Sequence, residues 1–401
     1  MNFFKSLYCR VFQSIMRCLS TFFPFKEPIL LDGIDELINV LKEKKINNLI
    51  IITDKIIRNI GLTKKLEDSL EKECISFCVY DNTNQNPTSN NVEEARELYL
   101  LNKCNAIIAF GGGSSLDCAK ALGARIVLPN KDLKSMQGLI KINKKLPLLI
   151  AIPTTAGSGS ETTVASVITD SNTHYKYVIN DFCLIPEYAI MLPEVTQTLP
   201  KHITSTTGMD ALTHAIEVYV GLSMTEKSKK AAEEAIKLIF ENLEKAYEDG
   251  EDLNARKNML YASYLAGTAF TRSYVGNVHA IAHTLGGKYN VPHGLANAVL
   301  LPHILTSYGD CVTKPLSELA RLTNLIDETV SDEEGAKKFI DEIYKMNERM
   351  NIPLKLDCVK KEDIANMAKL ADKEANPLYP VPVLWNEKEL EKIYYQICNE
   401  Q

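Results

Sequence analysis

The chain has little of what marks a nucleic-acid-binding protein. Its 401 residues carry 45 Lys and Arg against 51 Asp and Glu, a formal net charge of −6, and they contain no basic run. Because phosphate backbones are bound by clustered Lys and Arg, we expect no nucleic-acid partner. With 45% hydrophobic and 24% charged residues, the composition is that of a soluble globular protein large enough for two domains.

The chain also lacks the cysteine patterns of zinc fingers and disulfide frameworks. Ten cysteines are scattered without a CxxC pair, and the closest two, Cys74 and Cys78, stand in the apolar run ISFCVY, which is typical of a strand. We therefore expect reduced, packed thiols in a cytoplasmic protein. No HExxH motif is present, so a zinc-peptidase arrangement has no support.

Residues 1–27 form a basic arm without a long apolar run. Arg10 and Arg17 interrupt the apolar residues and leave only six residues between them, too few for the apolar region of a secretory signal or for a spanning helix of about 20 residues. Apolar residues recur at helical spacing, namely Leu7, Val11, Ile15 and Leu19. Three interpretations remain open for this helix: it covers the body or a partner subunit, it contacts a membrane peripherally, or it is an organelle-targeting peptide.

Residues 28–200 alternate between strand-like and helix-like segments. A helical pattern at 92–104 lies between apolar runs that read as strands, at 47–54, 75–81, 106–110 and 147–153, and further short strands are expected up to about residue 192. This alternation predicts a parallel sheet with helices on both faces. Residues 201–401 contain long helix-period segments, such as 225–249 and 255–270, and predict a helical domain.

Three polar segments follow predicted strands and together suggest a nucleotide site. FGGGSSLDCAK (110–120) is not a GxGxxG fingerprint, but its glycines and the helix that follows suit a phosphate. Asp54 ends another strand, where a carboxylate can bind ribose hydroxyls and repel a 2′-phosphate, favouring NAD over NADP. PTTAGSGSETT (153–163) follows a third strand. The carboxyl ends of parallel strands line one ligand crevice, so the three segments support each other.

Five residues of the second half are candidate metal ligands. Asp210 and His214 are four residues apart in a helical segment, His279 and His283 repeat this spacing, and His293 follows in a loop. Such a pair alone is more often a surface hydrogen bond, but five candidates on three segments predict a metal site. A catalytic metal keeps one position open for substrate, so one of the five should be free.

Four motifs together resemble one known family. GGGSSLDCAK, PTTAGSGSETT, TTGMDALTHAIEVY and HAIAHTLGGKYNVPHGLANAVLLPH, in this order, resemble the iron-containing (group III) alcohol dehydrogenases over about residues 28–401. The resemblance implies a dehydroquinate synthase-like fold, with an N-terminal Rossmann-like α/β dinucleotide domain, a C-terminal all-helical metal-binding domain and the active site in the cleft between them. It also implies a homodimer or a larger homo-oligomer. The family says nothing of residues 1–27.

The resemblance assigns roles to individual residues. It implies that Fe²⁺, with Zn²⁺ as an alternative, is held by Asp210, His214, His279 and His293, and that His283 is the free histidine near the nicotinamide. The residues implied to bind NAD are Asp54, Asn86, Gly112, Gly113, Ser114, Thr154, Thr155, Ser158, Val167, Lys176 and Leu192. Two of them depart from the usual pattern, since Ser158 stands where threonine is common and Leu192 where aspartate is usual.

The function implied is a metal-dependent oxidoreductase that transfers a hydride between a primary or small alcohol or aldehyde and NAD(H). His283 is the candidate for relaying the proton, because imidazole titrates near neutral pH. Two rivals remain: an NAD- and metal-dependent lyase of the dehydroquinate-synthase type, and a non-enzymatic protein whose helices are stapled by a metal.

Overall fold

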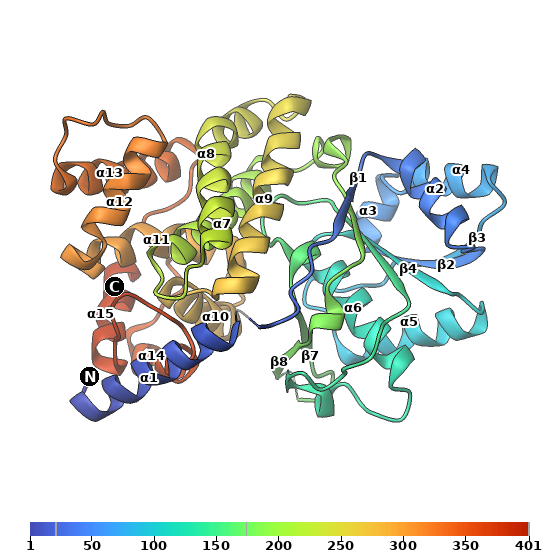
Figure 1. Cartoon of the computed structure of the whole chain (residues 1–401), viewed down its shortest axis with the longest axis horizontal. Coiled ribbons are helices and arrows are strands. Elements are labelled where there is room, and N and C mark those ends of the chain that lie inside the picture. Colours follow the sequence, from blue (N-terminus) through green and yellow to red (C-terminus); the bar gives the residue numbers. More distant parts are fainter. Residues whose placement is uncertain (21, 174, 400–401) are drawn as a thin grey trace. The chain divides into compact units, whose positions relative to one another are not determined.

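The computed structural model describes residues 1–20, 22–173 and 175–399. It divides the chain into two compact units, which are described separately (Figure 1). The sheet unit comprises Pro24–Thr198, and the helical unit comprises Met1–Phe23 and Leu199–Gln401. The first helix therefore belongs to the helical unit, although the sheet unit follows it in sequence.

The sheet unit is built on six parallel strands in the order β1-β9-β6-β4-β2-β3. The strands are β1 (Ile29–Leu31), β2 (Asn48–Ile52), β3 (Ser76–Tyr80), β4 (Ala106–Gly111), β6 (Leu148–Pro153) and β9 (Tyr188–Ile190). The helices are α2 (Ile34–Glu43), α3 (Lys55–Asn59), α4 (Lys64–Lys72), α5 (Ser89–Leu101) and α6 (Gly113–Val127). The predicted α/β fold is confirmed.

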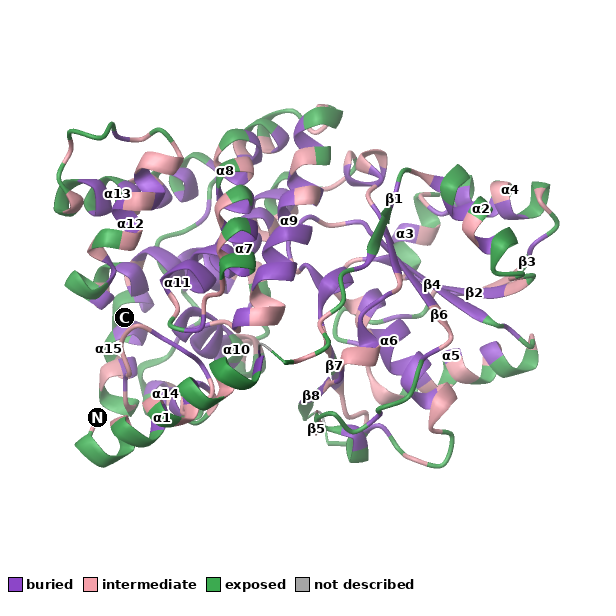
Figure 2. Cartoon of the chain, in the orientation of Figure 1, coloured by how far each residue is buried: buried purple, intermediate pink, exposed green. Residues whose placement is uncertain are grey.

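The apolar strand runs are explained by burial on both faces of this sheet. In β2, Ile50 and Ile52 belong to one core with α5 and α6, whereas Leu49 and Ile51 belong to a second core with α2 and α4. All four side chains are fully buried, as the purple colouring of β2 indicates (Figure 2). Side chains of a strand point alternately to its two faces, so a strand covered on both sides shows no polar alternation.

A smaller three-stranded sheet completes the sheet unit. Its order is β5-β8-β7, with β5 (Gly138–Leu139), β7 (Ala165–Thr169) and β8 (Lys176–Asn180). Strands β7 and β8 pair in antiparallel fashion, as two of the short strands expected before residue 192. Short 3-10 turns link these elements, at η1 (Lys134–Met136), η2 (Ser160–Thr162), η3 (Phe182–Leu184) and η4 (Pro193–Thr196).

The helical unit packs its helices around α7 (Lys201–Val220), which contacts α8, α9 and α11. Its other members are α8 (Glu226–Glu248), α9 (Leu253–Ser273), α10 (Asn277–Tyr289), α11 (His293–Tyr308), η5 (Gly309–Val312), α12 (Thr313–Leu322), α13 (Asp332–Arg349), α14 (Lys361–Ala375) and α15 (Glu387–Ile397). Residues Gly208 to Val220 of α7 are all buried. A helix covered on every side can hold polar groups such as Asp210 and His214 only when they have partners.

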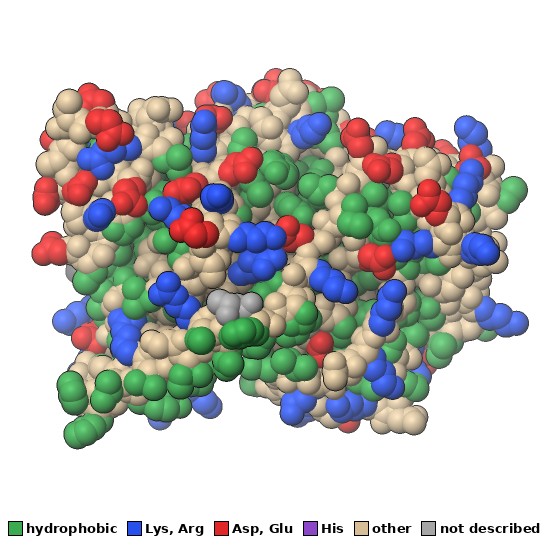
Figure 3. All heavy atoms as spheres, viewed as in Figure 1, with side chains coloured by type: hydrophobic (Ala, Val, Ile, Leu, Met, Phe, Trp, Pro, Cys, Tyr) green, Lys and Arg blue, Asp and Glu red, His purple; other side chains and the backbone are tan. Residues whose placement is uncertain are grey.

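The N-terminal arm is a helix, α1 (Phe3–Ser20), that contacts the helical unit through its polar side. Arg10 donates to the backbone oxygens of Val381 and Pro382 at 2.7 and 2.8 Å, and Gln13 donates to that of Tyr379 at 2.7 Å. Large apolar side chains are left exposed, namely Phe3, Phe4, Leu7, Tyr8, Val11, Ile15 and Leu19. Hydrophobic side chains are visible along this helix in Figure 3. Within the described residues, no helix has the length and apolar character needed to cross a membrane.

Candidate functional site

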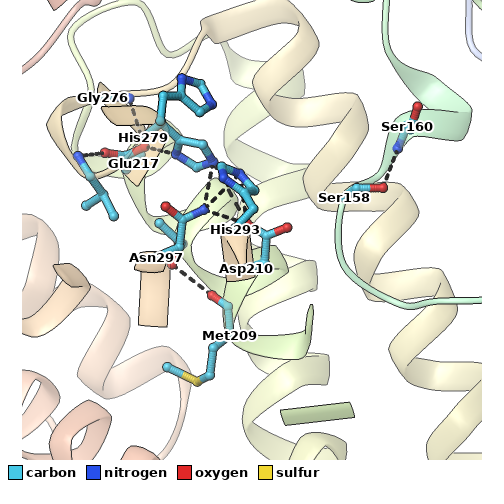
Figure 4. Close-up of polar contacts among 12 residues, drawn as sticks. Ser158, Ser160, Met209, Asp210, Glu217, Gly276, His279, His293 and Asn297 are labelled. Carbon is cyan, nitrogen blue, oxygen red and sulfur yellow. Dashed lines mark hydrogen bonds and ion pairs between the residues drawn. The ribbon is translucent and has the colours of Figure 1, made fainter. Parts of the chain in front are cut away.

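Three helices of the helical unit bring four of the five predicted metal-binding side chains together. Asp210 and His214 lie one turn apart on α7, His279 lies in the first turn of α10, and His293 is the first residue of α11. One ligand atom from each of the four lies within 4.8 Å of the others. Figure 4 shows Asp210, His279 and His293 pointing toward one another.

The close approach of α11 to α7 depends on Gly294, which follows His293. A Cβ atom at Gly294 would collide with the backbone oxygen of Thr206 on α7. Glycine therefore lets the first turn of α11 reach the backbone of α7, and this contact brings His293 Nε2 to 3.6 Å from Asp210 Oδ1.

The donor set fits a divalent transition metal. The Nδ2 atom of Asn297, on α11, lies 2.6 Å from Asp210 Oδ1, 3.2 Å from His279 Nε2 and 3.1 Å from His293 Nε2 (Figure 4). An amide nitrogen has two hydrogens and cannot satisfy three acceptors fully. One carboxylate with three imidazoles is a donor set that both Fe²⁺ and Zn²⁺ accept, and a cation could serve these converging lone pairs together.

Glu217 of α7 fixes the orientation of His279. Its carboxylate accepts from His279 Nδ1 at 2.6 Å and from the backbone N–H groups of Gly276 and Val278 at 2.8 and 2.7 Å. Burial lowers the pKa of His279 well below its usual value, so the ring is neutral, as a metal ligand must be. With Nδ1–H directed at Glu217, the lone pair of His279 lies on Nε2, which faces Asp210 and Asn297.

Replacing Glu217 by Ala should weaken metal binding although all four candidate ligands remain. Carboxylates that hold a ligating histidine contribute about 10- to 100-fold in metal affinity, and we expect a loss of that size in a chelator-competition titration. Glu217→Gln keeps an acceptor for Nδ1–H and should lose less. Equal affinity in Glu217→Ala and the unaltered protein would contradict this role.

His283 lies beside the four-residue cluster but outside it. Its ring centroid is 6.0 Å from that of His279 and 5.2 Å from that of His293, and it is not among the residues whose ligand atoms converge. Its Nδ1 atom lies 2.5 Å from Glu374 Oε1, and 45% of its side chain is exposed. The structure therefore separates one of the five sequence candidates from the other four.

In the sheet unit, the carboxyl ends of four neighbouring strands lie at one edge of the sheet. Register pairs Ile52 of β2 with Ala109 of β4, Ala109 with Ala151 of β6, and Ala151 with Ala189 of β9. The predicted nucleotide residues that follow this row by two or three positions are Asp54, Gly112, Thr154 and Leu192. Strand β2 leads outward to β3 before the chain returns to β4, which makes this edge a topological switch point, where ligands of open α/β sheets bind.

Two of the predicted loops pack against each other at this edge. A Cβ atom on Gly113 would lie 3.1 Å from Ser158 Oγ, and one on Gly112 would lie 3.5 Å from Thr155 Oγ1. The distance at Gly113 is tighter than an ordinary contact, so Gly113 allows the start of α6 to meet the segment after β6 closely, whereas the distance at Gly112 is an ordinary contact. The N–H groups of the first turn of an α-helix such as α6 lack partners within the helix, which is why helix starts suit phosphate groups.

The remaining predicted cofactor residues differ in their surroundings. Ser114 Oγ donates to the backbone oxygen of Gln85, and Lys176 Nζ donates to Asn86 Oδ1 at 2.9 Å. Asp54 caps α3 by accepting from Ile57 N–H at 3.0 Å. Val167 is partly exposed on β7, whereas the Leu192 side chain is buried in the apolar core. A direct cofactor contact of Leu192 would therefore have to come from its backbone.

Lys120 of α6 anchors the loop that carries Ser158. Its fully buried Nζ atom donates to the backbone oxygens of Ser160, Thr163 and Ala165 at 2.6, 3.0 and 2.9 Å, and Asp117 accepts from Ser160 Oγ. Lys120→Met would remove the one ammonium group that donates to all three of these carbonyl groups. We expect a loss of about 3–5 kcal/mol, or roughly 6–20 °C in the melting temperature of the sheet unit.

The control for this prediction is the exposed lysine substitution Lys144→Met, which should change stability by less than about 0.5 kcal/mol. Lys144 is exposed, and calorimetry of both variants measures the difference between their melting temperatures. Equal melting temperatures for the two would show that the buried ammonium group does not hold the loop.

Two family models together match most of the chain. Residues 31–193 match the family model described as iron-containing alcohol dehydrogenase, and residues 204–398 match that of the C-terminal part of the Fe-containing alcohol dehydrogenase family. The chain therefore belongs to the iron-containing alcohol dehydrogenase family, as the four motifs predict, and is an oxidoreductase.

Individual relatives agree over most of the chain. A 1,3-propanediol dehydrogenase of Citrobacter freundii is 37% identical over 351 residues, which cover 86% of this chain and 90% of the relative. An NAD-dependent methanol dehydrogenase of Bacillus methanolicus is 35% identical over 333 residues, or 82% and 87% of the two chains. The crystal structure of a 1,3-propanediol oxidoreductase has a TM-score of 0.90 and 34% identity, and the match covers 94% of this chain and 99% of that one.

Sequence reasoning did not single out three residues of the site. Glu217 lies three residues after His214, and Asn297 lies four residues after His293, so helical spacing places each beside a candidate ligand. That spacing is the signal that could have identified them. Glu374 carries no such signal, because it reaches His283 from α14, 91 residues further along the chain.

Proposed function

We propose that this protein is an iron-containing, NAD-dependent alcohol dehydrogenase that transfers a hydride between a primary or small alcohol or aldehyde and NAD(H). The observation that carries the proposal is the separation of the histidines: four side chains converge on one point, and His283 stays beside them with its ring exposed. A metal that only held the helices together would need no additional exposed histidine beside its ligands. The names of the propanediol and methanol dehydrogenases support small alcohols as substrates.

In the proposed site, Asp210, His214, His279 and His293 hold Fe²⁺, or Zn²⁺ where that metal is more available. A divalent cation bound there would act as a Lewis acid toward an alcohol or carbonyl oxygen. Three neutral imidazoles and one carboxylate leave the site with a net positive charge once the cation is bound. That charge favours the ionised form of an alcohol substrate.

We assign the relay of the substrate's proton to His283. Its distance from the cluster leaves it free of a ligand role, and an imidazole can accept and release a proton near neutral pH. The partial exposure of its side chain gives that proton a path to solvent. His283 thus complements a site whose other histidines are all used to bind the metal.

The proposed NAD site is formed by the sheet-unit residues named above. Asp54 follows β2 at the switch point, where its carboxylate suits ribose hydroxyls and repels a 2′-phosphate. Asp54→Asn should raise the efficiency with NADP relative to NAD by roughly tenfold, since removing one like-charge repulsion of about 1.4 kcal/mol corresponds to that factor. Asparagine also caps helices well, so the cap of α3 should survive.

Steady-state kinetics with both cofactors measures this preference. Asp35→Asn, at an acidic residue in the first turn of α2, serves as the charge-matched control and should leave the ratio unchanged. An unaltered ratio in Asp54→Asn would remove Asp54 from the cofactor site.

The experiment that tests the proposed function is NADH production from short alcohols and diols. A lyase of the dehydroquinate-synthase type returns its hydride within one turnover, so it would form no net NADH, and a metal staple would not bind NADH at all. Homo-oligomer formation, implied by the family, belongs to the same proposal. So does a cytoplasmic location, which the absence of disulfides among the ten cysteines supports.

A further inference from the structure

A second carboxylate–histidine pair lies beside the metal cluster, entirely within the helical unit. Glu374, in the last turn of α14, places its Oε1 atom 2.5 Å from Nδ1 of His283 on α10. The same oxygen accepts a hydrogen bond of 2.8 Å from the hydroxyl group of Tyr379. Two donors from different segments thus converge on one carboxylate oxygen.

We propose that Glu374 is a positioning residue for the reaction, which holds His283 in the tautomer and orientation that direct its Nε2 atom to the substrate's proton. This inference rests on the proposed function, because it deepens the role assigned to His283. It concerns a residue of α14 that lies outside the four motifs named in the sequence.

The chemistry of the pair determines the tautomer. An ionised carboxylate only accepts hydrogen bonds, so a neutral His283 facing Glu374 must carry its hydrogen on Nδ1. The lone pair then lies on Nε2, at the opposite side of the ring, and this is the atom that can accept a proton. Stacking on His293, with ring centroids 5.2 Å apart and planes inclined by 17°, restricts the ring further.

Tyr379 holds the carboxylate itself. Its side chain is buried, and burial raises the pKa of its hydroxyl well above the usual value of 10, so it remains a hydrogen-bond donor. The Oε1 atom of Glu374 therefore accepts hydrogen bonds from both the Tyr379 hydroxyl and Nδ1–H of His283. Such an outer carboxylate or hydroxyl group orients an imidazole without touching the substrate.

The two carboxylate–histidine pairs of α10 differ in burial. His279, one turn before His283 on α10, and its partner Glu217 on α7 are almost fully buried, with side-chain exposures of 3% and 2%. His283 and Glu374 are 45% and 32% exposed. A pair this exposed adds little to stability. Its geometry is better explained by a role at a substrate-accessible histidine than by a role in holding the fold.

Comparison of Glu374→Ala with Glu374→Gln tests this inference. Glu374→Ala should lower kcat by about 10- to 100-fold while KM for the alcohol and metal content stay unchanged. Glu374→Gln, whose amide oxygen still accepts from Nδ1–H, should recover most of the lost kcat. A kcat for Glu374→Ala equal to that of the unaltered enzyme would overturn the proposal, and so would a Gln variant no better than Ala.

The matched control is Asp363→Ala, which removes a different α14–α10 contact. Asp363 pairs with Lys288 at 2.9 Å and accepts from the Tyr289 hydroxyl at 2.7 Å, both on α10. If Glu374 only holds the two helices together, both alanine variants should lower stability and kcat alike. A loss of kcat confined to Glu374→Ala supports positioning.

A spectroscopic readout separates this inference from the proposed function. In ¹⁵N-histidine spectra of the zinc-loaded protein without substrate, His283 should show the Nδ1–H tautomer, and Glu374→Ala should lose that preference. The same tautomer mixture in both proteins would refute the positioning role, whatever the enzyme catalyses. Absence of alcohol oxidation with the tautomer shift intact would instead refute the proposed function alone.

Discussion

Asp210→Ala is expected to leave the protein without its metal and without measurable alcohol oxidation. Asp210 supplies the only carboxylate among the four converging side chains, and its Oδ1 atom lies within 4.0 Å of both His279 Nε2 and His293 Nε2. Removing it takes away one ligand and the negative charge that offsets the cation. Elemental analysis should find stoichiometric metal in the unaltered protein and very little in the variant.

Thermal unfolding gives an independent measure of the same loss. A metal that binds only the folded state at 100 to 1,000 times its dissociation constant stabilises that state by about 2.7–4.1 kcal/mol. Added metal should therefore raise the melting temperature of the unaltered protein but not that of Asp210→Ala. Asp249→Ala, at an exposed residue after α8, is the control and should respond like the unaltered protein. Stoichiometric metal in Asp210→Ala would contradict the ligand assignment.

His283→Ala is expected to retain its metal and lose turnover. General acid–base groups contribute about 10²- to 10⁴-fold, so kcat should fall by that factor. Metal content should stay stoichiometric, because the four ligand atoms that converge do not include one from His283. Metal analysis and stopped assays on the same preparation separate the two effects.

The control for this variant is His303→Ala, at another partly exposed histidine of the helical unit. His303 contacts the backbone oxygen of Leu354 and the hydroxyl of Tyr344, away from the cluster, and its loss should leave kcat unchanged. If His283→Ala loses its metal stoichiometrically, His283 is a ligand and the assignment fails. If it keeps full turnover, the proton takes another path.

Much of the fold could be predicted because buried elements are recognisable in the sequence by their pattern of apolar residues. Strands covered on both faces, such as β2 and β4, show unbroken apolar runs, and the glycines after β4 mark the turn into α6. The four side chains that converge are among the five candidates that helical spacing indicates, and they are the four that the family resemblance implies as ligands. Their convergence required only that three neighbouring helices pack together.

The rest depended on tertiary contacts that leave no local pattern. Glu374 meets His283 only because α14 packs against α10. For the N-terminal helix α1, a local pattern is present but indicates the wrong side. Amphipathicity ordinarily predicts that an apolar helix face is buried, but α1 places its polar side against the body. Arg10 and Gln13 donate to backbone oxygens in the segment that follows α14, and these hydrogen bonds determine which side of α1 faces inward.

The most direct test of the account is metal analysis of protein purified without oxygen, followed by NAD reduction with short alcohols and diols. We expect one divalent metal per chain, net NADH formation, and loss of both on chelation with recovery on adding Fe²⁺. Protein that is fully active without a bound metal would contradict it. So would stoichiometric metal with no net NADH from any alcohol or diol tested.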